Sequence, residues 1–326
     1  MISVVIPNYN GAEVLEACLL CLARQTVSDF EVILVDNGSR DRSLELAARV
    51  RPDVRTLVFE RNRGFAAAVN AGIRAARGRY VALLNNDVQV EPDWLEALVE
   101  ALEADPLVFA AGPKMLLDPE RHRINVVGIK LKPNAESGSI GAGQEDRGQY
   151  DRPGQVFGVS AGAALYRRDV FEDVGLFDED FFAYLEDVDL SFRARLLGYR
   201  FRYAPRARAY HLKGWTTRKK MPSAFEIRLN ARNVLLCQVK NLPAGAWQAH
   251  RARILGRHLE LFFRHTVQRL YKGDARPYLT GKMEFLRMRE AVLAKRRAVQ
   301  AARRVPDEAI TFWLGREVVV DGEETP

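Results

Sequence analysis

Two acidic segments of the sequence carry side chains that could do chemistry. The first is YVALLNNDVQV, residues 80–90, in which an apolar run ends in Asn85, Asn86 and Asp87. A carboxylate at the end of a buried strand can ligate Mg²⁺, which proteins hold through one or two carboxylates while substrate phosphates fill other positions. An ordinary turn before the next helix would also explain these three residues. Residues 80–90 alone leave both interpretations open.

The second segment is YLEDVDLSFR, in which Glu186, Asp187 and Asp189 follow a cluster of aromatic residues. Apolar surroundings and neighbouring like charges raise the pKa of a carboxyl group and move it toward use as a general base. Alternatively, the acids only stabilise a helix N-terminus, with Asp189 paired to Arg193 four residues on. We expect this alternative to hold for one or two of the three acids and not for all.

A third candidate is His211, which ends a short strand pattern in the segment AYH. Neutral imidazole is a common metal ligand, although a lone histidine is more often structural. Both interpretations of His211 stay open at this point.

Alternating strand and helix patterns in the first 112 residues must position these side chains. Short apolar runs predict strands at Ile2–Ile6, Val32–Val35, Val54–Phe59, Tyr80–Leu84 and Val108–Ala111. Helical patterns lie between them, at about residues 12–24, 43–50, 66–77 and 93–104. This order predicts an α/β fold with a doubly wound, mostly parallel sheet.

In parallel sheets of this kind, ligands bind beyond the carboxyl ends of the strands. The predicted strand ends are all polar, with the sequences PNYN, DNGS, ERNRG and NND. The chain contains neither the G-x-G-x-x-G fingerprint after its first strand nor a G-x-x-x-x-G-K-[ST] loop. A nicotinamide enzyme and a P-loop ATPase are therefore not expected.

The rest of the chain is less regular up to about residue 155. From about Lys114 to Pro153, Gly, Pro, Ser and charged residues predominate. Within this stretch, NAESGSIGAGQEDRGQ, residues 134–149, has almost no apolar content and predicts a mobile loop or lid. Beyond it we predict a helix at Glu186–Leu197, strands at Tyr199–Tyr203 and Ala207–His211, and long helices from about Ser223. Cys18, Cys21 and Cys237 lack the spacing of a zinc site and are expected to be reduced core thiols.

Charge divides the chain into two parts. The 326 residues carry a net charge of +7. Residues 213–304 hold 22 Lys and Arg against 5 Asp and Glu, a net charge of +17, whereas the remainder holds 27 against 37, a net charge of −10. No apolar run approaches the ~20 residues that span a bilayer, and the N-terminus lacks a signal-peptide pattern. We therefore expect a cytoplasmic protein.

Together these segments resemble the inverting GT-A glycosyltransferases of glycosyltransferase family 2, particularly the rhamnosyltransferase-like branch. The resemblance is carried, in the family's order, by VVIPNYNG, VDNGSRDRS, NRGFAAAVNAGI, YVALLNNDV, SAGAALYRRDVFEDVGLFDEDFFAYLEDVDLSFRARLLGYRFRY and AYH. It implies a GT-A fold, with a Rossmann-like, mostly parallel sheet flanked by helices. It also implies a nucleotide-sugar-dependent catalytic domain at residues 1–222 and a basic helical extension at residues 223–326.

The resemblance assigns roles to particular residues. The donor's base and ribose are expected at Pro7, Asn8, Tyr9 and Asp36. A second donor-binding segment is expected at Asn62, Gly64, Phe65 and Asn70. The family's D-x-D position, where Mg²⁺ or Mn²⁺ meets the diphosphate, is occupied by Asn85, Asn86 and Asp87. His211 matches a metal ligand of some relatives, and Asp187, preceded by Glu186, matches the base that deprotonates the acceptor hydroxyl.

The implied reaction is sugar transfer in cell-surface polysaccharide assembly. The branch favours L-rhamnose from dTDP-L-rhamnose as the donor and a glycan or polyprenyl-linked glycan as the acceptor. Two alternatives are a UDP-sugar-dependent transferase of the same fold and a non-catalytic relative that binds a nucleotide-sugar or glycan. Asn85, which replaces the first carboxylate of D-x-D, is the one departure that favours the non-catalytic alternative.

The basic tail has three open interpretations. Its helices could pack on the catalytic domain, attach the protein peripherally to the inner face of the cell membrane, or form a homodimer interface. Nucleic-acid binding is not expected, because nothing in the tail resembles a base-reading module.

Overall fold

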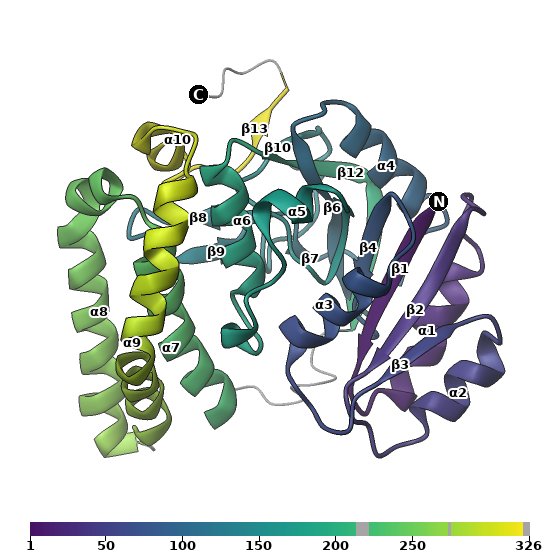
Figure 1. The fold of residues 1–326 in the computed structure, drawn as a ribbon, viewed down its shortest axis with the longest axis horizontal. Helices are drawn as coiled ribbons and strands as arrows, with labels where there is room; N and C mark the ends of the chain where they lie inside the picture. The colour runs from purple at the N-terminus through teal and green to yellow at the C-terminus, as the bar shows by residue number, and fades with distance from the viewer. Residues whose placement is uncertain (213–221, 273–274, 322–326) are drawn as a thin grey trace.

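The central sheet has a parallel half and a mixed half in the computed structural model (Figure 1), which describes residues 1–212, 222–272 and 275–321. Only the backbone is described for residues 267–272. The parallel half runs in the order β3-β2-β1-β4. Its strands are β1 (Ile2–Asn8), β2 (Phe30–Asp36), β3 (Arg55–Val58) and β4 (Tyr80–Leu84). All their carboxyl ends therefore meet at one edge, as the sequence predicts.

The mixed half continues the sheet in the order β11-β6-β12-β10-β13. Strand β11 (Ala163–Arg167) lies antiparallel to both β4 and β6 (Val108–Asp118), and β12 (Arg200–Leu212) runs parallel to β6. The short strands β10 (Gly154–Gln155) and β13 (Val319–Val320) complete the edge. A further strand, β5 (Val88–Val90), pairs with the end of β12 and brings His211 opposite Val88.

Helices cover both faces of this sheet. Alternate residues of β1 point to opposite sides, so Val4 and Ile6 belong to one core and Val5 to the other. The first core contains residues of α1 (Ala12–Leu22), α2 (Ser43–Val50) and α4 (Trp94–Glu103). The second contains residues of α3 (Phe65–Ala75), α5 (Val170–Val174) and α6 (Glu186–Leu196). Cys18, Cys21 and Cys237 are all buried free thiols.

The prediction of a mobile loop or lid at residues 134–149 is wrong, because the stretch from Lys114 to Pro153 that contains it forms short paired strands. The segment contains β7 (Ile124–Val126), β8 (Ile129–Leu131) and β9 (Ser137–Ser139), and β6 itself runs on to Asp118. Ile124, Leu131 and Ile140 are fully buried, and the buried Lys114 forms ion pairs with Asp146 and Asp151. Only isolated apolar residues anchor these short strands, so the sequence contains no continuous apolar run that would indicate them.

A second correction concerns the strands expected at 199–203 and 207–211. They form the single strand β12, whose pairing with β6 shifts in register between Ala204 and Arg208. Pro205 lies within that irregularity, where a residue without a backbone N–H is tolerated.

Long helices follow the sheet, as predicted from the tail. They are α7 (Ala224–Asn241), α8 (Ala244–Lys272), α9 (Arg276–Ala302) and the short α10 (Asp307–Thr311). Ser223 caps α7 in a capping box with Glu226. A third core lies between α6, α7, α9, α10 and the β8–β9 hairpin. Figure 1 shows α8 as the outermost of these helices.

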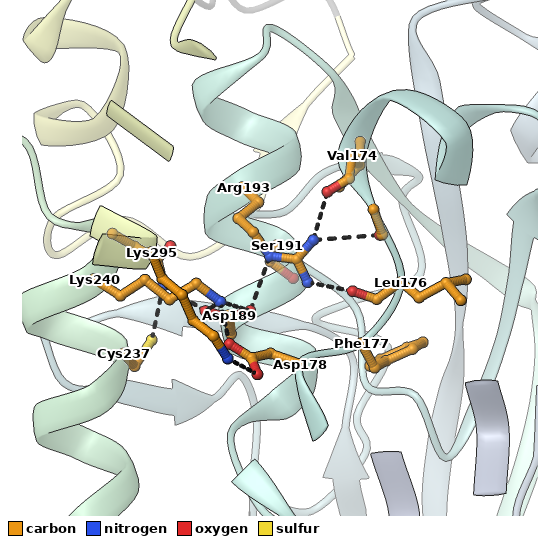
Figure 2. Close-up of polar contacts among 12 residues, drawn as sticks. Val174, Leu176, Phe177, Asp178, Asp189, Ser191, Arg193, Cys237, Lys240 and Lys295 are labelled. Atoms are coloured by element: carbon orange, nitrogen blue, oxygen red, sulfur yellow. Dashed lines mark hydrogen bonds and ion pairs between the residues drawn. The ribbon is translucent and has the colours of Figure 1, made fainter. Parts of the chain in front are cut away.

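A buried ion cluster joins α6 to this helical region (Figure 2). Asp189, fully buried on α6, accepts a hydrogen bond from Arg193 Nε at 2.9 Å, which confirms the predicted i,i+4 pair. It also contacts Lys240 Nζ at 2.9 Å and Asn241 Nδ2 at 2.8 Å, both on α7. Lys240 Nζ reaches Asp178 at 2.6 Å, and Lys295 of α9 reaches the same carboxylate at 2.6 Å.

The cluster keeps two buried carboxylates ionised. Burial by itself would raise the pKa of Asp178 and of Asp189. The ammonium of Lys240, together with Lys295 at Asp178 and Arg193 at Asp189, outweighs burial and holds both pKa values below the usual range. A carboxyl group with a lowered pKa in the folded state stabilises the fold above its unfolded pKa of ~4. That contribution is lost as the pH falls through the lowered folded pKa.

We predict that Lys240→Met lowers the free energy of unfolding by about 3–5 kcal/mol, because it leaves two carboxylates without their shared buried cation. Urea unfolding at pH 7 measures the loss. Lys295→Met is the matched control: its side chain is 38% exposed, so we expect a loss of less than about 1 kcal/mol. Equal losses in both variants would contradict the central role of Lys240.

Candidate active site

A cavity of about 540 Å³ lies beyond the carboxyl ends of the parallel strands. Nine residues predicted to bind the donor or metal line it: Pro7, Asn8, Tyr9, Asn62, Gly64, Phe65, Asn85, Asn86 and Asp87. Seven further residues that sequence reasoning did not select also line it, namely Asn37, which follows β2, and Phe182, Ala183, Tyr184, Ser223, Phe225 and Glu226. The wall thus combines strand ends, the segment before α6 and the start of α7.

Side-chain amides tie the strand ends together. Asn8 Nδ2 donates to Asp36 at 3.0 Å, and Asn86 Nδ2 donates to Asn8 Oδ1 at 2.7 Å. Asn37 Nδ2 donates to the carbonyl oxygen of Gly64 at 3.0 Å and to Asn62 Oδ1 at 3.1 Å. Asn37 lies within DNGS, so its position at a strand end was the signal that could have found it.

Two predicted donor-binding residues lie outside the cavity wall. Asp36 is 1% exposed and accepts hydrogen bonds from Asn8 and from the backbone N–H of Ser39. Asn70 is also 1% exposed. Its side-chain amide accepts a hydrogen bond from the N–H of Phe177 and donates one to the carbonyl oxygen of the same residue. The structure therefore shows Asp36 supporting Asn8, and Asn70 joining α3 to the chain before α6.

Asp87 and His211 come together as the predicted metal ligands. Asp87 Oδ2 lies 3.3 Å from His211 Nε2, because β5 pairs with β12 just beyond Asp87. The other ring nitrogen of His211 contacts Asn125 Oδ1 at 3.1 Å. No group of three or more His, Cys, Asp or Glu side chains with metal-binding geometry occurs among the described residues. At this position the described residues thus offer a metal one carboxylate and one imidazole as ligands.

Unsatisfied oxygen atoms show that this position suits a cation. Asp87 Oδ1 and Asn85 Oδ1 are both buried and have no hydrogen-bond partner. Buried acceptors without a donor are rare in proteins, and carboxylate and amide oxygens are ligands that divalent cations accept. The residues present therefore fit a divalent metal whose remaining positions are filled by substrate or water.

The acid pair begins α6. Glu186 is 7% exposed, and its Oε2 has no hydrogen-bond partner. Asp187 Oδ2 accepts from the backbone N–H of Ala161 at 3.3 Å, and its Oδ1 accepts from that of Val188 at 2.8 Å. Unlike Asp189, neither Glu186 nor Asp187 has a cationic partner within the part of the chain that the structure describes.

Burial raises the pKa of both members of the pair. The negative charge of Asp187 raises the pKa of Glu186 further, whereas the N–H groups of Ala161 and Val188 partly offset the rise at Asp187. A carboxylate with a raised pKa binds a proton more strongly, which suits a general base.

A strained segment connects the acid pair to the cavity. Phe182, Tyr184 and Leu185 have positive φ angles of 63°, 69° and 68°, a conformation that costs non-glycine residues about 1–3 kcal/mol each. The carbonyl oxygen of Phe182 accepts from the N–H of Ala66 at 3.3 Å. A Cβ atom at Gly64 would lie only 2.5 Å from this oxygen, so the close approach requires glycine there.

Comparison with known proteins identifies related chains. The model of a family described as Glycosyl transferase family 2 matches residues 3–175. A chondroitin synthase from Escherichia coli is 28% identical over 238 residues, which cover 64% of this chain and 34% of that protein. An N-acetylglucosaminyl-diphospho-decaprenol L-rhamnosyltransferase from Mycobacterium tuberculosis is 29% identical over 276 residues, covering 76% of this chain and 87% of that protein.

The fold itself matches solved glycosyltransferases. A mannosyltransferase from Pyrobaculum calidifontis, solved in complex with GDP-Man and Mn²⁺, superposes with a TM-score of 0.54 at 20% identity. The superposition covers 95% of this chain and 78% of that chain. This likeness confirms the predicted GT-A fold.

We predict that Asp187→Asn lowers turnover by about 10²–10⁴-fold, the usual contribution of a general base, and leaves nucleotide binding unchanged. Because the base must be ionised, wild-type turnover should fall as the pH drops through a pKa above the ordinary carboxyl range of ~4. The variant's residual rate should lack this dependence. Steady-state rates between pH 5 and 9 measure both effects, and wild-type-like turnover would remove Asp187 from the role.

Proposed function

Because the chain belongs to glycosyl transferase family 2, we propose that it transfers a sugar from a nucleotide-diphosphate donor to a hydroxyl of a glycan or lipid-linked glycan. The observation that carries this proposal is the continuity of the site. Phe182, Ala183 and Tyr184 line the strand-end cavity, and the strained segment to which they belong leads directly into Glu186 and Asp187. A donor in the cavity and a base beside it are what a single displacement requires.

Each residue has a defined part in this reaction. The strand-end residues bind the nucleotide, and among them Tyr9 is half-exposed and lines the cavity. Asp87, His211 and Asn85 would hold a divalent cation, which when bound neutralises the charge of the departing diphosphate. Asp187 removes the proton from the acceptor hydroxyl as that oxygen attacks the anomeric carbon. One displacement inverts the configuration of that carbon and needs no covalent enzyme intermediate.

The proposed donor is dTDP-L-rhamnose, and the proposed product a cell-surface polysaccharide. Support comes from the mycobacterial L-rhamnosyltransferase, whose match extends over most of both chains. The chondroitin synthase and the complex with GDP-Man belong to proteins with other substrates. A UDP-sugar donor is therefore the alternative that a binding experiment must separate.

We predict that one nucleotide among dTDP, UDP and GDP raises the melting temperature, and that Mg²⁺ or Mn²⁺ enlarges the increase. Ligand at ~100 times its dissociation constant adds ~2.7 kcal/mol to the free energy of unfolding. Asp87→Ala should abolish the part of the shift that depends on metal and keep the rest. Absence of a shift with any nucleotide, with or without metal, would overturn the proposed donor site.

We further propose that the outer helices contact an anionic membrane surface. No helix among the described residues is long and apolar enough to cross a bilayer. Four large apolar side chains of α8 are 51–69% exposed: Leu255, Leu259, Phe262 and Phe263. Exposed arginines, among them Arg251, Arg253 and Arg264, lie on the same helix. Apolar residues beside cationic ones are the pattern of helices that lie in a membrane interface.

We predict that the protein sediments with vesicles containing phosphatidylglycerol and not with vesicles of phosphatidylcholine alone. Each Lys or Arg near an anionic surface contributes about 1 kcal/mol, and salt weakens this attraction. Leu259→Glu should reduce binding, whereas Leu20→Glu, at a leucine of α1 that is 52% exposed, should not. Failure to sediment, together with dimerisation that Leu259→Glu abolishes, would assign this face to a homodimer instead.

A further inference from the structure

The strained segment before the acid pair is held by a side chain from the C-terminal helices. Asn233 of α7 is fully buried. Its Nδ2 donates to the carbonyl oxygens of Phe181 at 3.0 Å, Ala183 at 2.9 Å and Tyr184 at 2.7 Å. These three bonds cover the stretch in which Phe182, Tyr184 and Leu185 adopt positive φ angles.

Arg232 fixes the orientation of this amide. Its Nε donates to Asn233 Oδ1 at 2.9 Å, so the NH₂ end of Asn233 must face the carbonyl oxygens. A second nitrogen of Arg232 donates to the carbonyl oxygens of Asp180 and Phe181, at 2.9 Å each. The backbone from Asp180 to Tyr184 therefore has four carbonyl groups bonded by two adjacent residues of α7.

A side-chain amide satisfies the arrangement, and a carboxylate would not. An amide NH₂ group supplies two hydrogens that can be shared among three acceptors, whereas a carboxylate would present lone pairs to oxygen atoms. Removing the amide would leave the carbonyl groups of Ala183 and Tyr184 without this donor, whereas that of Phe181 would keep its hydrogen bond from Arg232. Segment 181–185 would then relax toward more common backbone conformations.

The same segment determines where the acids lie. Glu186 and Asp187 follow Leu185 directly, and Lys240 and Asn241 hold Asp189 in the same first turn of α6. We infer that Asn233 is a positioning residue for catalysis, which acts by holding segment 181–185 so that Asp187 faces the acceptor hydroxyl. This inference rests on the proposed role of Asp187 as the base.

The test compares Asn233→Ala and Asn233→Ser with Asn230→Ala. Asn230 is an exposed residue of the same helix, and its amide donates to the carbonyl oxygen of Glu226 within α7. A misplacement of the base by about 1 Å costs on the order of 10²-fold in rate, so we expect such a loss of kcat in Asn233→Ala. Asn233→Ser, which keeps one donor, should lose less, and Asn230→Ala should turn over like the wild type.

A double-mutant cycle separates positioning from a general loss of structure. If Asn233 acts through Asp187, Asn233→Ala should add little further loss to the residual rate of Asp187→Asn. An equal factor in both backgrounds would show a general structural effect and overturn the inference. Wild-type-like turnover of Asn233→Ala would overturn it as well.

Hydrogen exchange of the backbone amides tests the contact between Asn233 and segment 181–185 in the absence of substrate. We expect faster exchange of the amides of residues 182–188 in Asn233→Ala and unchanged exchange there in Asn230→Ala. Unchanged exchange in Asn233→Ala overturns the inference, even if that variant is inactive. A wild type that transfers no sugar but shows this pattern of exchange would instead refute the proposed function and leave the contact established.

Discussion

The arrangement of the site depends on how one helix turn holds three carboxylates. Asp189 is fully buried and neutralised by Arg193 and Lys240, with Asn241 as a further donor. Because these contacts fix α6, Glu186 and Asp187 can remain without a cation at its first turn. No cation opposes the desolvation of these two acids, so burial raises their pKa values. Neutralising all three acids would have given a stable helix start and no group suited to accept a proton.

The topology of the sheet explains why distant segments share one site. Parallel strands β1, β2 and β4 bring PNYN, DNGS and NND to one edge, as the sequence indicated. The mixed half of the sheet contributes His211, which the parallel strands do not carry. Strand β12 runs past the end of β4, pairs with β5 and places His211 against Asp87. The backbone pairing of β5 with β12 thus positions both candidate metal ligands.

The parts that the sequence predicted are those with local causes. Helix Ser43–Val50 and strand Tyr80–Leu84 were predicted to the residue, because helical periodicity and a bounded apolar run are local signals. Strands β7, β8 and β9 were missed. Each has only three or so residues, and each depends on pairing with a strand elsewhere in the chain. Asn233 was missed for the same reason: its acceptors lie about fifty residues earlier, and nothing near it indicates that they exist.

The inner face of α7 and the outer face of α8 carry different kinds of side chain. The inner face of α7 buries polar groups, Asn233 and Lys240 among them, that each meet a carbonyl or carboxylate partner. The outer face of α8 exposes leucine and phenylalanine beside arginine. Buried polar groups tolerate little displacement, so α7 and the acid-bearing segment must move together. A membrane contact made through α8 would then orient Glu186, Asp187 and the bilayer relative to each other, because α7 and α9 connect α8 to α6.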